Sequence, residues 1–153
     1  MKTEIQVLEH LKTTIATRLA TFFDNDGEII TIDEKNVEID FPDVDTMRRN
    51  TMLYIQPDYE NLEPLGFASD LATLRATVFI LCKGASSATL VKRVFAYYTA
   101  LYILLRRNST LSGFIDNTHI TDMDYYPAVT ASATITAIEV SIELQWSKDF
   151  QIH

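Results

Sequence analysis

Two aspartates, Asp122 and Asp124, have a residue type and a spacing that could support chemistry. They stand two positions apart in a stretch typical of a β-strand, so their carboxylates project from the same face. Paired carboxylates can act as general acid and base, or can bind a hard cation. Asp116 precedes them, yet no motif places a histidine, a glycine-rich loop or a nucleophile beside the three. A polar strand face is therefore the favoured interpretation, and a hydrolase or cation-dependent enzyme is the alternative.

The histidines and the single cysteine point to no other chemistry. His10, His119 and His153 are scattered, without metal-ligand spacing. Cys82 falls in an alternating apolar stretch, and nothing nearby in the sequence would lower the pKa of its thiol. The sequence also lacks a phosphate-binding glycine loop and a nucleophile elbow. We therefore expect no metal, no cofactor and no catalytic residue.

The negative charge of the chain is concentrated in one segment. The net charge is −8, and residues 24–45 hold nine acids and one base, which equals the whole net charge. Such a surface repels phosphate, so sequence-specific nucleic-acid binding is not expected. Two interpretations stay open: the segment is a solvated edge that keeps the protein soluble, or it borders the pore or an axial face of an assembly.

The elements that position these residues follow from hydrophobic periodicity. The 153 residues suit one domain, 1–153. Apolar residues at spacings of three and four predict helices, and alternation predicts strands. The predicted helices are 3–23 and 88–107, and the predicted strands are 37–41, 51–56, 72–82, 118–126 and 136–146. Because Pro57 closes the second strand, residues 57–71 are predicted to be a long loop.

The last strand carries the clearest pattern. From Ile138 to Trp146 every second residue is apolar, while Glu139, Ser141 and Glu143 lie between them. That pattern is typical of a strand covered on one side only. We therefore predict an α+β fold: a twisted, mixed or antiparallel sheet of about five strands with two helices packed on one face. The polar face is left to water, a pore or a neighbouring subunit.

The sequence predicts no contact with a membrane. The longest apolar stretch, from Val94 to Leu105, is shorter than a bilayer span of about 20 residues and has bases on both sides. The N-terminal residues lack the pattern of a signal peptide. A single cysteine fits a reducing compartment, so we expect a cytoplasmic protein.

Four tyrosines stand at predicted strand ends and loops: Tyr54, Tyr59, Tyr125 and Tyr126. Tyrosine combines apolar area with a polar tip, which enriches it at protein interfaces. The same side chains could instead close the core, and both interpretations stay open.

The second half of the chain resembles a known family. The helix with Val91–Ala96 leads into Leu104–Leu111 (LLRRNSTL), then into Ile120–Ala128 (ITDMDYYPA) and the alternating strand to Trp146. Over residues 85–146 this pattern resembles the tail terminator, or tail-completion, proteins of long-tailed bacteriophages. The first half of the chain does not contribute to the resemblance.

The resemblance implies a structural role. Proteins of that family form hexameric rings on the end of the tail tube, stop tube polymerisation and present a surface for the head. The expected partners are further copies of the chain, the tail tube protein and a head-completion protein. The expected location is the cytoplasm of a bacterial host and then the virion tail, in an active phage, a prophage or a tail-like particle. We expect contacts at Glu38, Asp40, Asp43, Asp45, Tyr59, Asp122, Asp124, Tyr125 and Tyr126.

A rival hypothesis is a small cytoplasmic adaptor that binds a protein or peptide along an exposed sheet edge. A ring predicts a solution mass several times that of the chain, whereas an adaptor need not self-associate. The enzyme hypothesis requires a metal-dependent activity.

Overall fold

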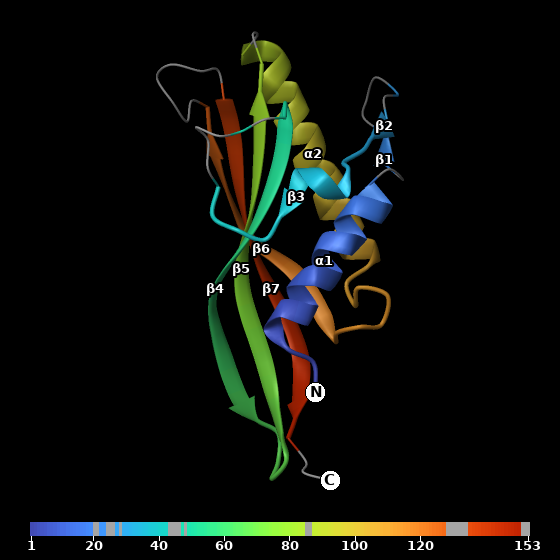
Figure 1. Cartoon of the computed structure of the whole chain (residues 1–153), viewed down its shortest axis with the longest axis vertical. Helices are drawn as coiled ribbons and strands as arrows, with labels where there is room; N and C mark the ends of the chain where they lie inside the picture. Colours follow the sequence, from blue (N-terminus) through green and yellow to red (C-terminus); the bar gives the residue numbers. More distant parts are fainter. Residues whose placement is uncertain are drawn as a thin grey trace.

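A computed structural model describes residues 1–19, 22–23, 27, 29–42, 47, 49–84, 87–127 and 135–150. Helices α1 and α2 lie on one side of a five-stranded sheet in the order β3-β4-β5-β7-β6 (Figure 1). β3 runs parallel to β4 and the other pairs are antiparallel. The predicted α+β fold with a mixed five-stranded sheet is therefore confirmed.

The elements are α1 (Glu4–Arg18), β1 (Phe22–Phe23), β2 (Ile29–Ile30), a 3-10 turn (Glu34–Asn36), β3 (Val37–Glu38), β4 (Thr51–Pro64), β5 (Ser69–Lys83), α2 (Ser87–Arg107), β6 (Asn117–Tyr126) and β7 (Ile135–Asp149).

The two central strands, β5 and β7, form the backbone of the core. They pair without interruption from Ser69 opposite Asp149 to Lys83 opposite Ile135. Their alternating apolar residues are buried on the helix side, as the pattern predicted. Trp146 is among these buried residues, and its indole N–H donates a hydrogen bond to the carbonyl of Lys2 at 3.3 Å. This bond ties the end of β7 to the residues that precede α1.

Helix α1 begins at a capping box. The Thr3 hydroxyl accepts a hydrogen bond from the Gln6 N–H, and the Gln6 side chain accepts one from the Thr3 N–H. The apolar spacing of three and four over the predicted helix 3–23 starts at Ile5 and would bury it, which is wrong: Ile5 is 60% exposed, whereas Val7 is buried. At 100° per residue, Ile5 lies about 200° from Val7, on the solvent side. The helix also ends before the predicted residue 23, because Phe22 and Phe23 pair with Ile30 and Ile29.

Helix α2 covers the sheet with one face. Leu90, Val94, Leu101 and Leu105 are buried, and the helix contacts β5, β6 and β7. By length and composition alone, residues 88–107 are apolar enough to cross a membrane. The helix is therefore longer than the apolar stretch recognised in the sequence. Because its buried face packs on the sheet, we describe α2 as a core helix whose other face is exposed.

The predicted loop 57–71 is wrong, because this segment is a β-hairpin. β4 continues through Pro57 to Pro64 and pairs with β5 as far as Pro64 opposite Asp70. The register shifts between Pro57 and Tyr59, which marks a bulge. A proline has no N–H to donate, but a bulge on an edge strand tolerates it. The far part of the hairpin, residues 57–72, is called the hairpin arm below, and its tip projects beyond both helices (Figure 1).

The predicted strand 37–41 is shorter than expected. Only Val37 and Glu38 pair, in parallel with Leu53 and Tyr54. Phe41 does not reach the helix-side core: it is exposed, and its ring lies 6.3 Å from that of Phe79. On this second sheet face a small apolar cluster covers one end, formed by Met47, Met52, Tyr54, Leu81, Ile135 and Ala137 with Phe79 at its margin. The face opposite the helices is therefore apolar at one end and polar over the rest.

Because the two faces of the sheet differ, substitutions at adjacent residues of β7 should change the free energy of unfolding by very different amounts. Ile142→Ala removes a fully buried side chain from the core and should lower the free energy of unfolding by about 2–5 kcal/mol. Ser141→Ala, on the polar face, should change it by about 0.5 kcal/mol or less. Urea denaturation of both variants checks this, and equal effects would contradict the assigned register.

Candidate interaction surface

A row of polar side chains crosses four strands on the sheet face opposite the helices. The register places Tyr59 of β4 opposite Arg75 of β5, and Glu143 of β7 opposite both Arg75 and His119 of β6. Arg75 Nη1 donates to Tyr59 Oη at 3.4 Å and lies 3.8 Å from Glu143 Oε1. His119 Nε2 lies 3.3 Å from Glu143 Oε2. We call this surface the polar face.

The next row extends the same network. Arg75 Nη2 donates to Thr121 Oγ1 at 3.1 Å, and the Thr121 hydroxyl donates to the carbonyl of Ser141. Thr77 donates to Asp58 Oδ2 at 2.8 Å. The hydrogen bond with Tyr59 is the foremost cause of a raised pKa for Arg75, so the guanidinium stays charged. These groups satisfy one another across the strands, which suits a structured contact surface.

The candidate aspartates do not converge into one site. Asp122 and Asp124 lie opposite Ser141 and Glu139, so they share the polar face as predicted, and both are exposed. Asp122 Oδ1 accepts a hydrogen bond from the Met123 N–H at 2.8 Å. Asp116 lies at the other end of β6, where its Oδ2 accepts from Ser147 Oγ at 3.4 Å. Within the described ranges, no group of three histidine, cysteine, aspartate or glutamate side chains could hold a metal ion.

The tyrosines divide between the two interpretations left open above. Tyr54 is buried in the small cluster, and Tyr125 packs on Phe95 of α2 with ring centroids 5.2 Å apart. Tyr59 and Tyr126 are exposed. The hydroxyl of Tyr126 donates to Glu139 Oε2 at 3.3 Å, and the negative charge of Glu139 raises the pKa of this tyrosine. Tyr54 and Tyr125 therefore close the core, whereas Tyr59 and Tyr126 are available for contacts.

The acidic segment is described only in part. Glu38 is exposed on β3, and Asp40 is exposed in the bend that follows, where its Oδ1 accepts the N–H of Phe41 at 2.7 Å. Asp43 and Asp45 lie outside the described residues. Glu38 and Asp40 are thus available for contacts, as expected for either interpretation of the segment.

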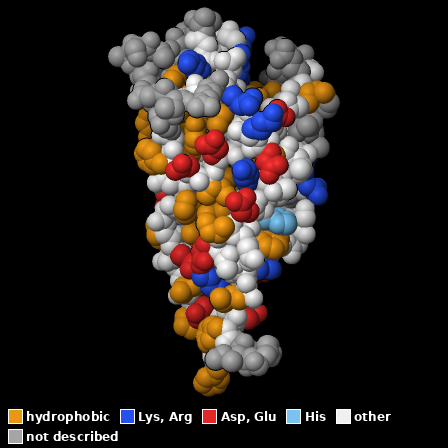
Figure 2. Space-filling view, in the orientation of Figure 1, with side chains coloured by type: hydrophobic (Ala, Val, Ile, Leu, Met, Phe, Trp, Pro, Cys, Tyr) orange, Lys and Arg blue, Asp and Glu red, His pale blue; other side chains and the backbone are white. Residues whose placement is uncertain are grey.

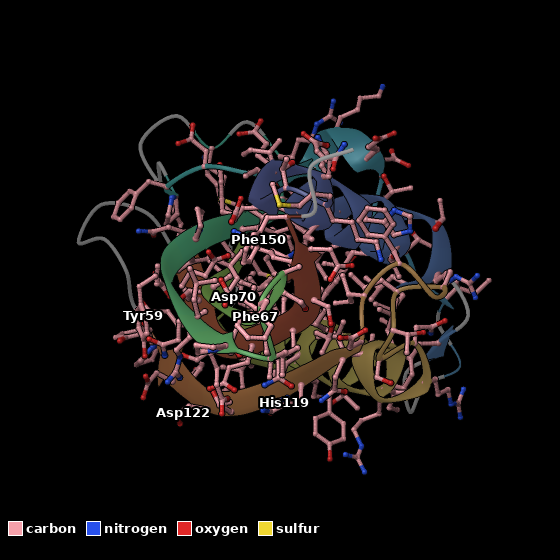
Figure 3. All side chains as sticks on the ribbon, turned by 90° about the horizontal axis from the view of Figure 1, so that it is seen from below. Tyr59, Phe67, Asp70, His119, Asp122 and Phe150 are labelled. Atoms are coloured by element: carbon pink, nitrogen blue, oxygen red, sulfur yellow. The ribbon has the colours of Figure 1, made fainter. Side chains whose placement is uncertain are left out.

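Sequence reasoning missed an apolar tip on the hairpin arm. Leu62, Leu65 and Phe67 are exposed there, and Phe67 is fully so. Phe150 joins them, because its N–H donates to the carbonyl of Ala68 at 2.9 Å. Figure 2 shows apolar side chains at this narrow end, and Figure 3 shows Phe67, Asp70 and Phe150 together when the end is viewed head-on. The sequence feature that could have indicated this tip is the recurrence of apolar residues among acids in the predicted loop 57–71.

An ion-paired lysine anchors the base of the arm. Lys148 of β7 contacts the carboxylate of Glu4, at the start of α1, and lies 2.9 Å from Glu60 Oε2 of β4. The hydrogen bond with Lys148 lowers the pKa of Glu4, whereas burial raises the pKa of Glu60. Burial alone would lower the pKa of Lys148, but its two carboxylate partners raise it. The arm is therefore tied to both α1 and β7.

No model of a known protein family matches this chain, and a search of curated proteins found no match. The contacts described above therefore carry the functional argument together with the sequence resemblance.

The structure makes a direct prediction for Cys82. This thiol is fully buried, and burial raises its pKa to about 11. In the folded protein at mildly alkaline pH it should therefore not react with a thiol reagent such as DTNB. One equivalent should react after unfolding in urea. Rapid reaction of the folded protein would contradict the core assignment.

The aspartates of β6 provide a further test. Because Asp122 and Asp124 are exposed, Asp122→Asn/Asp124→Asn should change the free energy of unfolding by only about 0.5 kcal/mol per site. Urea denaturation measures this change. A metal-dependent hydrolytic activity that the double variant abolishes would support the enzyme hypothesis instead.

Proposed function

We propose that this protein is a non-enzymatic assembly protein that forms a ring on the end of a phage tail tube, stops tube polymerisation and offers a surface for head attachment. The observation that carries the proposal is the combination of an open sheet edge with a projecting, apolar-tipped arm. β3 pairs only with Leu53 and Tyr54, so in the described part of the chain the outer edge of β4 beyond Tyr54 has no strand partner. β6 forms the opposite edge of the sheet.

Two different open edges on one chain favour head-to-tail contacts. Unpaired strand edges offer rows of N–H and C=O groups for another chain. When a surface of one copy meets a different surface of the next, the contact repeats and closes into a ring if the rotation allows it. The polar face supports the same proposal, because a face with satisfied polar groups can face a water-filled channel or a neighbour.

The tail-tube part of the proposal rests on the resemblance over residues 85–146. That range corresponds to α2, the connector, β6 and β7. The net charge of −8 adds physical support, because an acidic ring repels phosphate and lets DNA pass without binding it. The partners proposed are other copies of this chain, the tail tube protein and a head-completion protein. The proposed location is the host cytoplasm before assembly and the virion tail afterwards.

The open outer edge of β4 also favours a second candidate function. A cytoplasmic adaptor could bind an extended peptide there by adding a strand to the sheet. The backbone groups beyond Tyr54 supply the hydrogen bonds that such a peptide needs. This candidate predicts a monomer that binds a partner segment, so self-association distinguishes the two.

Solution mass tests the proposal. Sedimentation velocity over a wide concentration range should reveal a species several times the chain mass of 17.4 kDa, with six copies as the expected ring. Adding purified tail tubes should increase the assembled fraction, because a tube end templates the ring. A monomer at every concentration, unchanged by tubes, would contradict the ring and favour the adaptor.

A further inference from the structure

The hairpin arm combines an apolar tip with negative charge. Residues 57–72 contain four acids and no base. Leu62, Leu65 and Phe67 are exposed at the tip, and Glu63 is exposed among them. Exposed apolar side chains gathered at one end of a molecule can mark an interaction site. Whatever binds the tip should therefore be apolar at its centre and positively charged around it.

The arm is already ordered in the single chain. Its ladder is paired out to Pro64 opposite Asp70, and the Leu65 N–H donates to the carbonyl of Ser69 at 2.9 Å. Lys148 holds its base through Glu60. Because the backbone of the arm is already ordered, binding costs little conformational entropy there. Most of the free energy gained by burying the apolar tip then contributes to affinity.

Helix α2 has the opposite charge and a matching apolar face. Residues 87–107 contain four bases and no acid. Lys92 and Arg106 are exposed, as are Val91 and Tyr102, at 37% and 44%. At 100° per residue these four positions fall on one face of the helix. The exposed face of α2 therefore presents Val91 and Tyr102 with Arg106 and Lys92 beside them, which suits an apolar tip that carries acids.

A small pocket lies at the border of this face. It has a volume of about 70 Å³ and lies between Tyr102 and Arg106 of α2 and residues 118–120 of β6. Thr118 lines it and is only 3% exposed, yet its hydroxyl has no hydrogen-bond partner among the described residues. A buried hydroxyl without a partner is unfavourable.

We propose that the tip of the hairpin arm in one copy docks on the exposed face of α2 in the next copy, with its acids near Lys92 and Arg106. This inference rests on the proposed ring and names the contact that builds it. Glu63 and Asp70 are the acids at the tip, whereas Glu60 is paired with Lys148 at the base of the arm, and α2 has four bases without an acid. The tip projects beyond both helices (Figure 1), so one copy cannot make this contact with itself. The contact is head-to-tail, which is the type that generates rings.

The first experiment removes the apolar centre of the contact. Phe67→Ser alters a fully exposed side chain, so the fold should be retained, which circular dichroism verifies. Sedimentation velocity should show self-association at least tenfold weaker than in the unchanged protein. The matched control is Phe41→Ser, which changes an exposed phenylalanine outside the arm and should assemble normally.

The second experiment exchanges the charges. Glu63→Lys and Lys92→Glu/Arg106→Glu should each weaken self-association, because each places like charges together. Combining all three changes in one chain should restore it at least partly, since the tip of each copy then meets a helix of opposite charge again. Arg49→Glu/Lys83→Glu makes the same change in charge at exposed positions outside both surfaces and should have a smaller effect.

The outcomes separate this inference from the proposed function. If the unchanged protein forms rings and both Phe67→Ser and the charge variants assemble equally well, the docking contact is overturned while the ring stands. If Phe67→Ser forms normal rings but no longer attaches to tail tubes, the tip binds the tube protein, which also overturns docking on α2. An unchanged protein that stays monomeric contradicts the ring and the docking contact together.

Discussion

The antiparallel pairing of β5 with β7 is the constraint on which the rest of the structure depends. The two strands pair continuously from Ser69 opposite Asp149 to Lys83 opposite Ile135. β4 adds to the outer edge of β5, β6 adds to the outer edge of β7, and α2 packs on the apolar face that the pair creates. Because side chains alternate with period two, a shift of one residue would turn Trp146 and its neighbours outward. Burial on the helix side therefore specifies the register.

The length of this pair also creates the surfaces that matter for function. The central strands extend beyond the region that the two helices cover, so the tip of the hairpin arm projects without a helix beside it (Figure 1). Lys148 partly replaces the missing helix contacts, because its ion pairs link the base of the arm to Glu4 of α1. On the polar face, opposite the helices, the row from Tyr59 to His119 is held together by hydrogen bonds and ion pairs rather than by apolar packing. The features suited to partners thus lie on the polar face, at the sheet edges, at the tip and on the exposed face of α2.

The structure places the residues that could do chemistry apart from one another. Cys82 is a core side chain near the Thr51 hydroxyl, with Sγ 3.8 Å from Oγ1. Asp116 contacts Ser147 at one end of β6, whereas Asp122 and Asp124 are exposed towards the other. Carboxylates become acid–base catalysts when a shared, partly dry environment separates their pKa values. The exposed strand that carries Asp122 and Asp124 does not supply such an environment.

The sequence by itself determined the elements whose signals are local. Strict alternation from Ile138 to Trp146 specifies a strand with one buried face, and the stripe in α2 specifies a helix, because both patterns depend only on neighbouring residues. Tertiary structure decided the rest. Pro57 ends a strand by local rules, yet β4 continues past it, because β4 is an edge strand with a bulge there. Likewise, only packing decided that Tyr125 packs on Phe95 and that residues 57–72 form an arm. In each case the deciding partner is distant in the sequence, so local patterns could not specify it.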